Sequence, residues 1–189
     1  MSKVKTILIT TLALTLICVF FTAALAVTNE ITAEKIAEVQ KEAEMQAMTR
    51  VLPADNYVVG TVQVADADYY AAMDANGTVL GHIFTTSANG YGGEVKVMTG
   101  IAPDGKIIAI EVIDAADETP GLGQNATKKT FWEQFKGKSG QLSVVKSGVG
   151  ENDIQALTGA TITSNAVKDA VNKALTAHKL IKGEAENNG

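Results

Sequence analysis

The sequence predicts an α+β protein, with a single N-terminal transmembrane helix followed by one extracytoplasmic domain that has an antiparallel β-sheet and flanking helices. Three observations predict this class. Residues 6–27 contain no charged side chain, residues 57–145 form short β-rich runs between turn sequences, and residues 165–180 place apolar side chains at helical spacing. Because 189 residues allow one compact domain and an anchor, a single site is expected.

The N-terminal segment is predicted to cross a membrane. A helix over residues 6–27 would rise about 33 Å at 1.5 Å per residue, which is enough to span the hydrocarbon core. Two lysines precede this run and two glutamates follow it: Lys3, Lys5, Glu30 and Glu34. The positive-inside rule therefore predicts a cytoplasmic tip at residues 1–5 and an extracytoplasmic location for everything after the span.

A cleaved signal peptide is the alternative, because Ala24-Leu25-Ala26 resembles a cleavage site. The apolar run is longer than a typical signal core, which favours the anchor. Cys18 is the only cysteine and lies within this run, which excludes an internal disulfide and a cysteine-ligated metal. His82 and His178 are far apart in the sequence, and a solitary histidine is more often packed or solvated than a ligand, so no metal site is predicted.

Charge excludes one class of partner. The formal net charge is −5, and it becomes more negative once the two N-terminal lysines are set aside. Nucleic acid would be repelled. Residues 28–54 are predicted to be a linker helix, helical from about 29 to 50 and ended by Pro53. Its apolar stripe is weak and its charges are many, which is typical of a solvated stalk rather than a partner-binding face.

Residues 55–182 are predicted to form the folded domain, and residues 183–189 a disordered tail with little to bury. The expected strands are Tyr57–Val64, Tyr69–Met73, Val79–Thr86, Glu94–Thr99, Lys106–Ile113 and Leu142–Val145. The turn sequences at residues 74–77 and 102–105 both end in glycine after Asn or Asp, so each predicts a hairpin. A short helix is expected over residues 127–136. The helix over 165–180 has one apolar face, formed by Val167, Val171, Ala174, Leu175 and His178.

The segment Leu157–Ser164 is a loop that enters this last helix, and it is the most informative part of the sequence. Gly159 and Ala160 remove side-chain bulk from the chain path. Four hydroxyls stand just before the unpaired N–H groups of the helix, on Thr158, Thr161, Thr163 and Ser164. Such a loop suits a phosphate. The alternative is structural, with Thr163 or Ser164 capping the helix and the other hydroxyls solvated.

The run Thr158-Gly159-Ala160-Thr161 resembles the attachment motif of the FMN-binding domains found in Rnf and sodium-pumping quinone reductase complexes. The resemblance implies that Thr161 is joined by a phosphodiester to FMN, and that Thr163 and Ser164 form the usual hydroxyl-rich continuation. Thr161 would then be a modified residue, not a catalytic nucleophile. The chain departs from the family at Gln155, where many members have an aspartate.

Two further segments strengthen the resemblance. The run Glu118-Thr119-Pro120-Gly121-Leu122-Gly123 resembles the family's loop over the flavin rings. Gly123 would let the backbone approach a flat ring, Leu122 would pack on its face, and Glu118 would orient the loop. Alone, this run would indicate an ordinary Pro-Gly turn. Asn89–Gly93 resembles the family's glycine-rich stretch, in which Tyr91 either flanks the flavin or belongs to the core.

The resemblance implies an RnfG-like electron relay that carries covalent FMN in an ion-translocating ferredoxin:NAD oxidoreductase complex of the membrane. The partners implied are the other Rnf subunits and a flavin transferase, and the chain alone is not expected to catalyse a reaction. Three alternatives remain open: the equivalent subunit of a sodium-pumping NADH:quinone reductase, a cofactor-free anchored binding module, and a flavin enzyme acting on an external small molecule.

Overall fold

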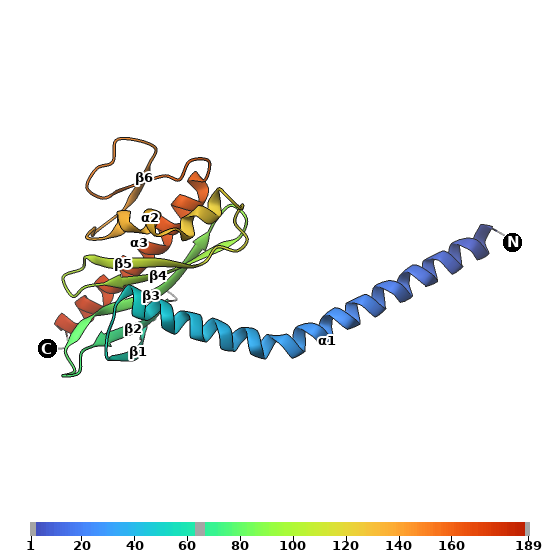
Figure 1. Ribbon diagram of the computed structural model, residues 1–189, viewed down its shortest axis with the longest axis horizontal. Coiled ribbons are helices and arrows are strands. Elements are labelled where there is room, and N and C mark those ends of the chain that lie inside the picture. The colour runs from blue at the N-terminus through green and yellow to red at the C-terminus, as the bar shows by residue number, and fades with distance from the viewer. Residues whose placement is uncertain (1–2, 63–66, 188–189) are drawn as a thin grey trace. The chain divides into compact units, whose positions relative to one another are not determined.

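The computed structural model describes residues 3–62 and 67–187 (Figure 1). The chain divides into two units, residues 1–43 and residues 44–189. Helix α1 runs without a break from Lys3 to Val51, so the predicted membrane helix and the predicted linker helix are parts of one element. Within the described residues, one stretch of helix, Ile7–Ala33, is long and apolar enough to cross a membrane.

The second unit is built on a five-stranded antiparallel sheet in the order β1-β2-β3-β4-β5. Its strands are β1 Asn56–Val62, β2 Ala67–Met73, β3 Val79–Asn89, β4 Glu94–Ile101 and β5 Ile107–Asp114. The turns at residues 74–77 and 102–105 connect β2 to β3 and β4 to β5, so both predicted hairpins are confirmed. Two residues of the first predicted strand, 63 and 64, lie outside the described residues.

Helix α3, Thr161–Asn187, covers one face of this sheet and contacts mainly β3 and β4 (Figure 1). The five side chains predicted to share its apolar face are all buried, as expected. Phe84, Val97 and Ile101 pack against that face from the sheet. Thr86 also donates its hydroxyl to the carbonyl of Ala170 at 2.8 Å, which fixes the helix along β3.

The other face of the sheet is covered by the last turns of α1 that belong to the second unit. Ala47, Met48 and Val51 are buried there with Ile83 and Met98. The interpretation of residues 29–50 as a solvated stalk is therefore wrong for the final turns. These few apolar positions lie on one side of the helix, and a stripe this short is enough to match the narrow face of a sheet.

The remaining elements differ in detail from the prediction. The short helix expected over residues 127–136 is three pieces, η1 Gly123–Thr127, α2 Lys129–Trp132 and η2 Glu133–Phe135, because Lys128 is extended between the first two. Strands β6 Ser143–Val145 and β7 Asp153–Gln155 pair in parallel, and β7 was too short to show a periodic pattern. The prediction of disorder from residue 183 is wrong as far as Asn187, because alanine and glutamate there continue α3.

Candidate functional site

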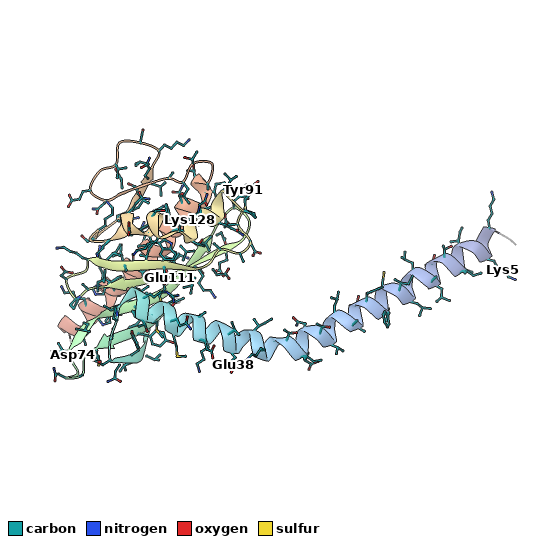
Figure 2. The ribbon with its side chains drawn as sticks, viewed as in Figure 1. Lys5, Glu38, Asp74, Tyr91, Glu111 and Lys128 are labelled. Carbon is teal, nitrogen blue, oxygen red and sulfur yellow. The ribbon has the colours of Figure 1, made fainter. Side chains whose placement is uncertain are left out.

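A cavity of about 520 Å³ lies where three segments of the second unit meet. The segments are the turn between β3 and β4, the loop that follows β5, and the start of α3. Tyr91, 72% exposed, projects from the first of them (Figure 2). The cavity is lined by Tyr91, Glu118, Thr119, Leu122, Gly123, Gly159, Ala160, Thr161, Ile162 and Thr163.

The predicted site residues gather around this cavity. Of the eleven, all line it except Thr158 and Ser164. Ile162 lines it as well, and the sequence reasoning missed it because an apolar residue between two threonines gave no chemical signal. The three segments are far apart in the chain, and the fold brings them together through the β3–β4 hairpin and the packing of α3 on the sheet.

The four hydroxyls in the loop before α3 differ in what they contact. The Ser164 hydroxyl accepts the Leu157 N–H and donates to the Ala160 carbonyl, each at 2.9 Å, and Ser164 is fully buried. Thr163, 1% exposed, donates its hydroxyl to Glu118. Among the described residues, the hydroxyls of Thr158 and Thr161 have no hydrogen-bond partner. Of these four, only Thr161 is therefore both free and part of the cavity wall.

The first turn of α3 supplies backbone donors beside this free hydroxyl. Thr161, Ile162 and Thr163 have N–H groups without a hydrogen-bond partner in the described part of the chain. Unpaired N–H groups at a helix N-terminus attract an anion, and the helix dipole adds to the attraction. The expectation that Thr163 or Ser164 merely caps the helix holds for Ser164, whose hydroxyl is used within the loop.

Glu118 is the buried charge of the site. Its carboxylate is 2% exposed and accepts the N–H groups of Tyr91 at 2.8 Å and Gly92 at 3.0 Å, besides the Thr163 hydroxyl. Burial opposes ionisation, but these hydrogen bonds outweigh that cost, so the pKa of Glu118 is lowered from its ordinary value near 4.5. The carboxylate is ionised at neutral pH.

Two glycines permit the close packing around this carboxylate. A Cβ on Gly90 would lie 2.2 Å from Glu118 Oε1, and a Cβ on Gly123 would lie 2.4 Å from Oε2. Neither distance is possible for real atoms, so a side chain at either position would displace the carboxylate. The glycine-rich stretch and the loop after β5 thus have a shared reason for their glycines, which no local turn explains.

The prediction that the two histidines are solitary is wrong. His82 on β3 and His178 on α3 lie with ring centroids 5.4 Å apart, next to a second cavity of about 350 Å³. Burial lowers the pKa of both rings, and for His178 the charges of His82 and Lys182 lower it further while Asp104 opposes this. Within the described residues no three potential ligands cluster as a metal site would require.

The histidine pair predicts a pH dependence of stability. Because the folded-state pKa of each ring lies below the ordinary 6.5, the unfolded chain binds more protons at mildly acidic pH. Stability is therefore complete above pH 6.5 and falls as the pH drops from there through the folded values. Urea unfolding of the chain at pH 7.5 and 5.5 measures this. The double variant His82→Gln, His178→Gln should have a flatter profile, and an unchanged slope would contradict the assignment.

Comparison with known proteins agrees with this site. The sequence profile of FMN-binding domains matches residues 90–176, which include all three segments around the cavity. The crystal structure of Shewanella oneidensis NqrC has the same fold, with a TM-score of 0.55 and 20% identity over 72% of this chain and 74% of that one. The second unit is therefore an FMN-binding domain, attached to a helix able to span a membrane once.

The N-terminal helix and the relatives specify the family. Residues 1–51 match the RnfG N-terminal region. The RnfG-type subunit of the Na⁺-translocating ferredoxin:NAD⁺ oxidoreductase complex of Acetobacterium woodii is 39% identical over 176 residues, covering 82% of this chain and 84% of the relative. Its counterpart in the proton-translocating complex of Clostridium ljungdahlii is 35% identical over 158 residues, covering 83% and 81%. The chain belongs to the RnfG family, whose members are subunits of ion-translocating oxidoreductase complexes.

Proposed function

We propose that this chain is an electron relay that carries FMN as a phosphate ester of Thr161, within a membrane-bound, ion-translocating ferredoxin:NAD oxidoreductase complex. Its partners are the other subunits of that complex, and a flavin transferase installs the cofactor. The names of the relatives and the match to the RnfG N-terminal region support the assembly. The match to FMN-binding domains supports the cofactor.

One observation supports Thr161 as the attachment residue more than any other. Its hydroxyl is free and lines the cavity, whereas the hydroxyls of Thr163 and Ser164 are engaged and that of Thr158 lies outside the cavity wall. In net terms the ester forms from the Thr161 hydroxyl and the FMN phosphate with loss of one water. The free N–H groups of the first turn of α3 would then stabilise the phosphate charge.

The rest of the cavity suits a flat, mostly apolar ring system. Leu122 and Ile162 are 44% and 54% exposed, which is unusual for large apolar side chains unless something covers them. Tyr91 supplies an aromatic face at the opposite segment. When bound, the flavin supplies one- and two-electron chemistry, and the protein holds it and excludes water from it.

The two lysines before the span and the glutamates after it support an extracytoplasmic position for the flavin domain. On that side a cofactor held only by weak contacts would be lost by diffusion. A covalent ester prevents the loss while leaving the ring system chemically unchanged. The alternative of a cofactor-free binding module predicts a colourless protein.

The test is to produce the full chain in detergent with a flavin transferase present, denature it, and examine the protein band. We expect flavin fluorescence that survives denaturation, and a peptide containing Thr161 whose mass is increased by FMN less one water. A chain produced without the transferase is the control and should stay dark. If the transferase labels an established substrate in the same cells but not this chain, the attachment proposal is wrong.

A further inference from the structure

Glu118 connects all three segments of the cavity. It belongs to the loop after β5, it accepts backbone N–H groups from the β3–β4 turn at Tyr91 and Gly92, and it accepts the hydroxyl of Thr163 from the first turn of α3. The loops make few other contacts that could fix their relative positions, since the tips at Tyr91 and Leu122 are exposed. One carboxylate therefore holds together parts of the wall that belong to different elements.

The charge of this carboxylate is also unusual for its surroundings. Of the ten described residues that line the cavity, only Glu118 carries a formal charge at neutral pH. Glu118 forms no ion pair in the described part of the chain. Its negative charge is stabilised by neutral donors only, so it is not cancelled by a nearby cation and acts on whatever occupies the cavity.

We propose that Glu118 is the positioning residue of the flavin site, and that its ionised carboxylate also lowers the reduction potential of the attached flavin. The proposal rests on the proposed FMN at Thr161. An electron added to the flavin brings negative charge next to a buried carboxylate, and this repulsion disfavours the reduced form. Gly90 and Gly123 leave space for the carboxylate at this one place, which keeps the charge at a fixed position in the wall.

The variant Glu118→Gln separates charge from size. The amide still accepts one or two N–H groups, but it cannot accept the Thr163 hydroxyl at its NH₂ end, and it carries no charge. In the flavin-loaded full chain the reduction potential should shift to a more positive value. In the chain without flavin, the amides of Tyr91 and Gly92 should exchange hydrogen about tenfold faster, because a bond to a charged acceptor is replaced by a weaker one.

Two further variants make the result specific. Glu94→Gln removes an exposed carboxylate that bonds to Ser87 outside the cavity, and it should leave both the potential and the exchange rates as in the wild type. Thr163→Val keeps the charge of Glu118 but removes one of its donors. It should speed amide exchange at residues 91 and 92 while leaving the potential much nearer to the wild-type value than Glu118→Gln does.

The two halves of the experiment can fail separately from the proposed function. If the wild-type chain acquires no covalent flavin, the proposed function is wrong, and amide exchange without flavin still decides whether Glu118 holds the loops. If Glu118→Gln has a wild-type potential, the electrostatic role is overturned. Should Glu118→Gln fail to fold, Thr163→Val remains, and unchanged exchange at residues 91 and 92 in that variant would overturn the positioning role.

Discussion

Replacing Thr161 by valine is expected to abolish covalent attachment of FMN, with labelling at least about 100-fold below that of the wild type. Valine has the shape and β-branching of threonine, so α3 should begin as before, and only the hydroxyl that would form the ester is lost. The other hydroxyls of this loop should not substitute for it. Thr163 and Ser164 are buried and hydrogen-bonded, and Thr158 lies outside the cavity wall.

The measurement compares flavin fluorescence of the denatured full-length chain after expression with the transferase. A control on the same helix is Thr176→Val, since Thr176 lies outside the cavity and its hydroxyl bonds only to the Asn172 carbonyl. That variant should be labelled like the wild type. Full labelling of the Thr161→Val chain would place the attachment elsewhere, and peptide mass mapping would identify the residue.

The variant with the largest expected effect on stability is Phe84→Ala. Phe84 is fully buried between the sheet and α3, with its ring stacked on Tyr69 at 5.7 Å and edge-on to His178 at 6.3 Å. Truncation removes a large buried side chain and leaves a cavity, which typically costs about 3–5 kcal/mol. Domains of this size are stable by only about 5–15 kcal/mol, so much of the stability would be lost.

Urea unfolding of the flavin-free chain can be followed by Trp132, which is half-buried and donates its indole N–H to the Ala126 carbonyl. Tyr91→Ala is the matched control, because Tyr91 is an exposed aromatic residue and its truncation should change the unfolding free energy by less than about 0.5 kcal/mol. A loss of less than about 1 kcal/mol for Phe84→Ala would mean that the contact between α3 and the sheet contributes little to stability.

The elements that could be predicted from sequence are those with a strong local signal. The hairpin turns contain Asn-Gly and Asp-Gly, and the apolar face of α3 repeats every three to four residues, so both were predicted and both are confirmed. Strand β7 has only three residues, too few to show alternation. The burial of Met48 and Val51 could not be predicted because a weak stripe on a charged helix has no meaning until a sheet face is found to match it.

The sequence by itself determined the family, the apolar N-terminal helix and the segments that would form the site, because each is carried by contiguous residues. Only the tertiary structure decided which side chains of those segments act together. Sequence spacing does not show that Glu118 accepts the hydroxyl of Thr163, 45 residues away, or that His82 and His178 meet across the core. Such contacts depend on how α3 packs on the sheet, and that packing is a property of the whole domain rather than of any segment.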